Sequence, residues 1–108
     1  AEETSENLAM AALAVDACSR LNKAAIAMGD TKQKPEDVAR LCHEVADAAT
    51  KAGQAMSAGV TRLFAKEGDD AATIHALKMN RFYFAQYSAI DACKRASRSI
   101  EEILLETA

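Results

Sequence analysis

The chain has no tryptophan, one proline, four glycines and only five aromatic residues among its 108. Glycine and proline supply most turns, and an all-β protein needs a turn about every eight to twelve residues, so this composition excludes an all-β fold. It equally excludes collagen-like and proline-rich chains. No segment approaches the ~20 uninterrupted apolar residues that a membrane-spanning helix requires. We therefore expect neither a membrane span nor a low-complexity chain.

A strong charge of one sign is also lacking. Lysine and arginine number 13 against 16 acidic residues, a net charge of −3. Such a balance gives no general attraction to nucleic acid or to an anionic membrane surface. The one basic cluster, Lys94, Arg95 and Arg98, is bracketed by acidic residues that can pair with it on a helix surface. We expect no nucleic-acid partner.

Cysteine is too scarce for a disulfide scaffold. Cys18, Cys42 and Cys93 lie far apart, form no CxxC pair and leave one thiol over. Free thiols and a reducing, cytoplasmic location are the expectation; one disulfide plus one free thiol is the alternative. His43 and His75 stand in no HxxxH pair, so we expect no metal and no cofactor. A thiol or metal site formed across helices remains a further alternative.

Alanine, in contrast, is abundant: 25 residues, within a chain that is 50% hydrophobic and 27% charged. This is enough for one globular domain, residues 1–108, with a single core. Over about residues 5–28, apolar and small residues recur at alternating spacings of four and three, which predicts an amphipathic helix. The predicted buried stripe is Asn7, Ala11, Ala14, Cys18, Leu21, Ala25 and Met28.

Two longer helical patterns follow. Pro35 opens the second at a position that suits its fixed φ, and the pattern keeps its phase to about residue 66. Gly53 and Gly59 interrupt it, so either this helix is continuous with a close-packed glycine face, which we favour, or it breaks there and makes four helices. Asp69 or Asp70 caps a third helix that reaches about Thr107.

These patterns predict an all-α, up-and-down antiparallel bundle of three long helices, joined by short connections. The first helix is too short to cover the apolar faces of the other two. Alanine-rich faces allow close approach but bury little area, and stability scales with buried area. We therefore expect the chain to associate with a second copy as a homodimer.

Four of the five aromatic residues lie close together on the third helix, as Phe82, Tyr83, Phe84 and Tyr87. Successive helical residues are ~100° apart, so one core face cannot hold all of them. With Tyr83 on the core face, Phe82 lies on one side, and Phe84 and Tyr87 lie on the other. Two interpretations stay open. One is a wide core, since a central helix of a four-helix arrangement is apolar over more than half of its circumference. The other is a contact surface for a second copy of the chain or for a partner protein, since interface cores are enriched in aromatic residues.

The predicted function is a non-enzymatic protein-interaction module that uses these four rings and Met79. The alternative is a bundle that binds a small apolar molecule between its helices, against Phe82, Tyr83 and Met79. No GxSxG elbow or phosphate-binding loop points to an enzyme.

A third hypothesis concerns His75. The segment His75-Ala76-Leu77-Lys78 resembles the short core of histidine phosphotransfer domains, which are helical bundles of similar size. The resemblance implies a phospho-accepting role for His75. It covers four residues, and this chain continues with Met79, Asn80 and Arg81 where that family has glycine and small residues.

Overall fold

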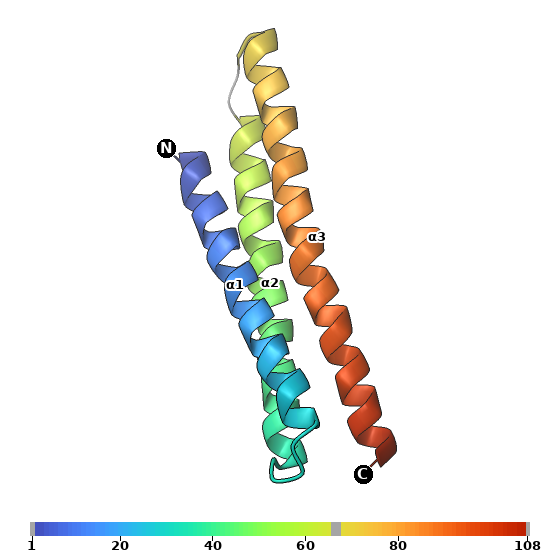
Figure 1. Ribbon diagram of the computed structural model, residues 1–108. Coiled ribbons are helices and arrows are strands. Elements are labelled where there is room, and N and C mark those ends of the chain that lie inside the picture. The colour runs from blue at the N-terminus through green and yellow to red at the C-terminus, as the bar shows by residue number, and fades with distance from the viewer. Residues whose placement is uncertain (1, 66–67, 108) are drawn as a thin grey trace.

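Three helices account for nearly all of the chain. The computed structural model describes residues 2–65 and 68–107, which form α1 (Glu2–Met28), α2 (Pro35–Ala65) and α3 (Asp70–Thr107) without any strand. Each helix packs against the other two. Consecutive helices run antiparallel, so α1 and α3 are parallel to one another (Figure 1). The predicted all-α bundle is confirmed, with three helices rather than four.

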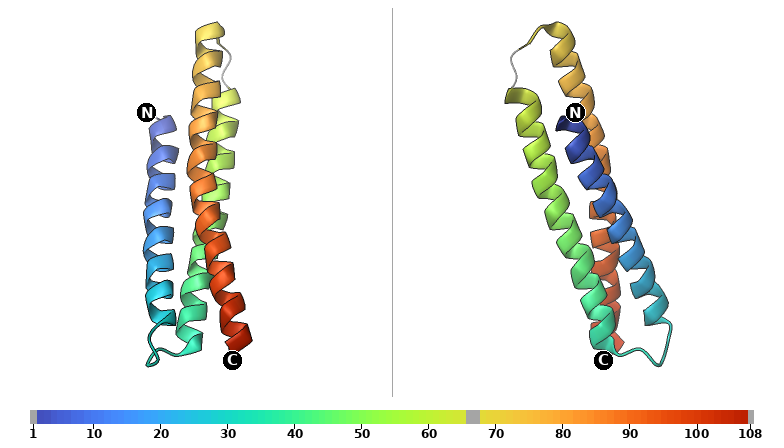
Figure 2. Two further views of the ribbon diagram at one scale, coloured as in Figure 1. Left: turned by 45° about the vertical axis from the view of Figure 1, so that its right-hand side comes forward. Right: turned by 90° about the vertical axis from the view of Figure 1, so that its left-hand side faces the viewer.

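The helices differ in length, with 27, 31 and 38 residues. α1 begins well below the turn that joins α2 to α3, so the first turns of α3 rise beyond it (Figures 1 and 2). The molecule is correspondingly thin and long, 59 × 22 × 15 Å. The upper end of the bundle is therefore built from two helices instead of three.

Local side-chain chemistry sets the helix ends. The carboxylate of Asp69 accepts a hydrogen bond of 2.9 Å from the backbone N–H of Ala72, so Asp69 is the N-cap of α3. In the connection before α2, the Asp30 carboxylate accepts from the backbone N–H of Lys32, a local turn. Pro35 is the first residue of α2, as predicted.

The core consists of three clusters that follow one another along the bundle. The lower cluster centres on Cys42 and Ile100, the middle one on Val45 and Ile90, and the upper one on Tyr83. Most of the middle cluster is alanine (Ala17, Ala48, Ala49 and Ala52). Small side chains let the three backbones approach, but each removes little area from water.

The predicted stripe of α1 is confirmed in part. Ala14 and Leu21 pack against the middle cluster, but the fully buried residues lie one position before the predicted Ala11, Cys18 and Ala25. Met10, Ala17 and Ala24 are fully buried, whereas Ala11 and Cys18 are exposed. Alanine occupies both the predicted and the observed positions, so the pattern of apolar residues does not distinguish these two phases. Packing against α2 and α3 decides between them, because only one phase turns the long side chain of Met10 into the upper cluster.

α2 is continuous through both internal glycines, and a tyrosine ring of α3 lies beside each of them. A Cβ at Gly59 would lie 3.0 Å from two ring atoms of Tyr83, and a Cβ at Gly53 would lie 3.5 Å from Tyr87. The distance at Gly59 is tighter than nearly all carbon contacts of a real Cβ, whereas the one at Gly53 is ordinary. The predicted close-packed glycine face therefore exists, and Gly59 is its essential member.

Replacing the two glycines by alanine should have opposite effects. Alanine gains about 1 kcal/mol of helix propensity over glycine at either position. At Gly59 the new methyl group meets the ring of Tyr83, which is fully buried, and overpacking costs about 1–3 kcal/mol. We expect Gly59→Ala to lower the free energy of unfolding by roughly 1 kcal/mol and Gly53→Ala to leave it unchanged or raise it, as measured by urea denaturation. Equal stabilisation by both variants would contradict the contact.

Candidate functional site

The structure separates the five residues predicted as an interface. Tyr83 is fully buried in the upper cluster, and Met79 and Tyr87 pack partly buried against it. Phe82 and Phe84 remain on the surface, 51% and 61% exposed. Two residues apart on a helix, they point ~200° apart. Of the predicted set, only these two rings are more exposed than buried, and they belong to different faces.

Phe84 lies in a groove between α2 and α3. A hollow of about 420 Å³ is lined by Phe84 and Asn80 of α3 and by Met56 and Val60 of α2, together with Ser57 and Thr61. A second hollow of about 310 Å³ continues along α3 and shares Asn80 with the first. Its other lining residues are Ile74, Leu77, Lys78 and Arg81. Because of the shared residue we treat the two as one feature, the α2–α3 groove.

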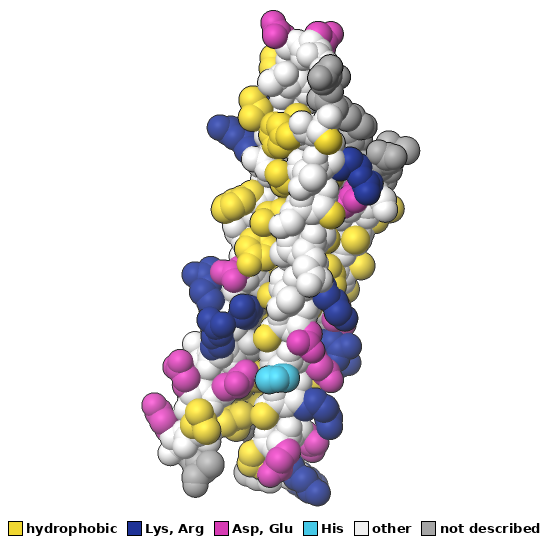
Figure 3. Space-filling model, turned by 180° about the vertical axis from the view of Figure 1, so that it is seen from behind, with side chains coloured by type: hydrophobic (Ala, Val, Ile, Leu, Met, Phe, Trp, Pro, Cys, Tyr) yellow, Lys and Arg dark blue, Asp and Glu magenta, His cyan; other side chains and the backbone are white. Residues whose placement is uncertain are grey.

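Exposed apolar side chains lie beside the α2–α3 groove. Ile74 and Leu77 are each about half exposed beside it. Apolar side chains gather over the upper part of the molecule seen from behind, and most of the charges on that side lie lower down (Figure 3). Exposed apolar groups that form a contiguous patch rimmed by charge mark interaction sites more often than scattered ones do.

Sequence reasoning missed Ile74 and Leu77, although their spacing was readable. Asp70, Ile74, Leu77, Arg81, Phe84 and Ser88 follow one another at alternating steps of four and three, a heptad spacing on α3. This second stripe lies to one side of the core stripe that contains Tyr83. α3 therefore has two apolar stripes: one packs into the core of the bundle, and the other lies exposed along the α2–α3 groove.

The charged side chains have two different roles. On the α1 side two ion pairs join α1 to α2: Glu6 pairs with Arg62 at 3.0 Å, and Arg20 pairs with Glu44. Arg20 also pairs with Asp16 within α1. Lys78 and Arg81 instead line the α2–α3 groove. The groove is therefore apolar with a cationic margin.

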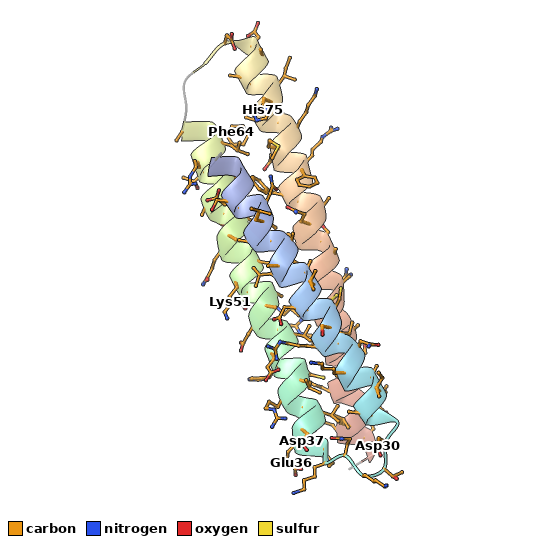
Figure 4. All side chains as sticks on the ribbon, turned by 60° about the vertical axis from the view of Figure 1, so that its left-hand side comes forward. Asp30, Glu36, Asp37, Lys51, Phe64 and His75 are labelled. Carbon is orange, nitrogen blue, oxygen red and sulfur yellow. The ribbon has the colours of Figure 1, made fainter. Side chains whose placement is uncertain are left out.

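His75 lies elsewhere, at the upper end of the bundle. It is exposed and lines a hollow of about 250 Å³ together with Phe64, Leu63 and Ala76. Figure 4 shows His75 and Phe64 on facing sides of the gap between α2 and α3. Neither His75 nor His43 gathers with other ligating side chains, since no group of three His, Cys, Asp or Glu lies together among the described residues.

The cysteines divide into one buried thiol and one pair. Cys42 is fully buried, and burial, followed by the nearby Glu101, raises its pKa above the ordinary thiol value. Cys18 was expected on the buried stripe, but it is exposed because of the shifted phase of α1. Its Sγ lies 3.7 Å from the Sγ of Cys93 on α3.

Comparison of the chain with protein-family models, curated proteins and solved structures finds no match. In the part of the chain that the structure describes, no helix has the combined length and apolarity needed to cross a membrane.

The raised pKa of Cys42 predicts a pH-dependent contribution to stability. The folded chain keeps this thiol protonated to a higher pH than the unfolded chain does, so the contribution is complete below the ordinary thiol pKa and is lost as the pH rises through the folded value. We expect the difference in unfolding free energy between wild type and Cys42→Ala to narrow from about pH 7 to about pH 10 in urea titrations. Val45→Ala, which removes a buried group that does not titrate, is the control. An unchanged Cys42 difference would show the prediction wrong.

Proposed function

We propose that the protein is a self-associating helical module that forms a homodimer through the α2–α3 groove. The observation that carries the proposal is the stripe of Ile74, Leu77 and Phe84, which lies exposed beside a hollow that Met56 and Val60 extend onto α2. The groove offers apolar contacts, an amide and two cations. Such a lining suits binding, in which aromatic residues and arginine contribute most of the energy.

The extent of the surface supports a second copy as the occupant. The chain exposes 7031 Å², whereas a compact monomer of this mass exposes about 5,800 Å². Its radius of gyration is 17.2 Å, compared with about 13 Å for a compact domain of this length. A standard interface covers about 800 Å² on each partner. A dimer along the long axis would therefore bring the exposed area per chain close to the usual value.

The stripe is also complementary to itself. In a two-fold dimer the same surface faces itself in reverse order. If the two α3 helices lie antiparallel with Ile74 of one copy opposite Leu77 of the other, the residues four further out on each side, Asp70 and Arg81, also become opposite. The apolar residues then meet in the centre, and opposite charges meet at both ends. This antiparallel contact is the arrangement we propose.

Substituting Leu77 should dissociate the dimer. An aspartate at this position places a charge in the centre of the apolar contact, opposite Ile74 of the second copy, and loss of a central apolar residue costs about 1.4–2.8 kcal/mol, roughly a 10- to 100-fold rise in Kd. We expect sedimentation equilibrium to give twice the chain mass for the wild type at tens of micromolar and the chain mass for Leu77→Asp.

Phe82→Asp is the matched control, since this side chain has similar exposure on the same helix but does not line the α2–α3 groove. It should remain a dimer. A monomeric wild type, or equal dissociation by both substitutions, would refute the proposal. Retention of an apolar small molecule by a monomeric wild type would instead favour the ligand-binding alternative.

Exchanging the charges of Asp70 and Arg81 tests the proposed antiparallel arrangement of the two α3 helices. Asp70→Lys and Arg81→Glu should each weaken the dimer about two- to fivefold, because each places like charges opposite one another at the edge of the contact. The double variant restores opposite charges and should recover most of the affinity. Additive weakening in the double variant would show that these residues do not face each other.

A further inference from the structure

Cys18 and Cys93 form a thiol pair on the side of α3 that faces α1. Their Sγ atoms are 3.7 Å apart, although the residues are separated by 75 positions in the chain. A disulfide bond is ~2.05 Å long, so the two sulfurs need to approach by only ~1.7 Å. Rotation about χ1 together with a small helix shift can supply such a movement.

We propose that Cys18 and Cys93 are a reversible disulfide site that fastens α1 to α3. The oxidant we assign is a small-molecule disulfide of the glutathione type. Cys42 is excluded from this site because it is buried in the lower cluster among Ala24, Val38 and Ile100, whereas Cys93 packs against the middle cluster. The site thus uses two of the three cysteines and leaves one as a core thiol.

The thiol–disulfide exchange with oxidised glutathione proceeds in two steps. The Cys18 thiolate attacks one sulfur of the oxidised glutathione, forms a mixed disulfide and releases one glutathione thiolate. The Cys93 thiolate then attacks the Cys18 sulfur, forms the Cys18–Cys93 bond and releases the second. The two protein thiols lose one proton and one electron each, and oxidised glutathione is reduced to two glutathione molecules.

Exposure sets the order of the two thiols. Cys18 is exposed and open to a bulky reagent, whereas Cys93 is partly buried. Burial, followed by its hydrogen bond with Cys18, raises the pKa of Cys93, so at neutral pH this thiol is the weaker attacker of a reagent in solution. Once Cys18 carries glutathione, Cys93 is already adjacent and completes the bond.

The bond would reinforce the smallest of the three helix–helix contacts, the one between α1 and α3. These two helices are not consecutive in the chain, since α2 lies between them. A bond between Cys18 and Cys93 therefore closes a long loop, which restricts the unfolded chain more than a short loop does. The α2–α3 groove is lined by α2 and α3 alone. Oxidation should therefore change stability and leave self-association unaffected.

The test treats the reduced full chain with oxidised glutathione and then alkylates the remaining thiols under denaturing conditions. We expect a chain lighter by two hydrogen atoms before alkylation, one alkylated cysteine, Cys42, and a peptide map that links Cys18 to Cys93. The thermal midpoint should rise by roughly 10 °C. Cys42→Ser should form the same disulfide and leave no cysteine to be alkylated.

The single variants distinguish the two thiols. Cys93→Ser should retain one glutathione on Cys18, and Cys18→Ser should take up glutathione much more slowly; neither should gain thermal stability on oxidation. The proposal is overturned if Cys18 and Cys93 both stay alkylatable, if each carries its own glutathione, or if the disulfide joins two chains.

Discussion

The contact between the Tyr83 ring and the backbone of Gly59 is the constraint from which the rest of the molecule follows. Tyr83 is the largest fully buried side chain, and it fits because α2 has no Cβ at the point where the ring lies. This contact sets how closely α2 and α3 approach and how α3 is rotated. With Tyr83 turned inward, Phe82 and Phe84 must point to opposite sides. The position of Phe84 in the α2–α3 groove is thus a consequence of a core contact.

Small side chains explain the shape of the bundle. The alanines of the middle cluster let three backbones approach closely, and the result is a rod 59 Å long and 15 Å thick at its narrowest. A thin rod exposes much surface for its mass, and α1 leaves the upper end of α3 uncovered. The same composition that permits close packing therefore leaves an apolar stripe on the outside.

The two proposals concern opposite sides of α3. The α2–α3 groove belongs to self-association, and the Cys18–Cys93 pair belongs to the contact between α3 and α1. Neither depends on the other. Ion pairs add a third kind of connection, because Glu6–Arg62 and Arg20–Glu44 both link α1 to α2. Ion pairs thus connect α1 to α2, and the Cys18–Cys93 thiol pair lies where α1 meets α3.

Much of the fold could be predicted from the sequence because its determinants are local. Pro35, the acidic first turns and the few glycines mark where helices begin and end. The apolar spacing keeps the same helical phase across Gly53 and Gly59, and it therefore predicted a continuous α2. The rotation of α1 could not be predicted, since alanine at positions 11, 14, 17, 24 and 25 gives no preference between neighbouring phases.

The candidate site depended on tertiary structure in the same way. The sequence by itself determined that three adjacent aromatic residues cannot share one face, because helical geometry forbids it. The sequence also placed Tyr83 on the core face, with Phe82 and Phe84 on either side, and this prediction is confirmed. Only the packed structure showed that the space beside this ring comes from a glycine 24 residues away in another helix. The approach of Cys18 to Cys93 is likewise a matter of tertiary structure: residues 75 apart become neighbours only when α1 and α3 lie side by side.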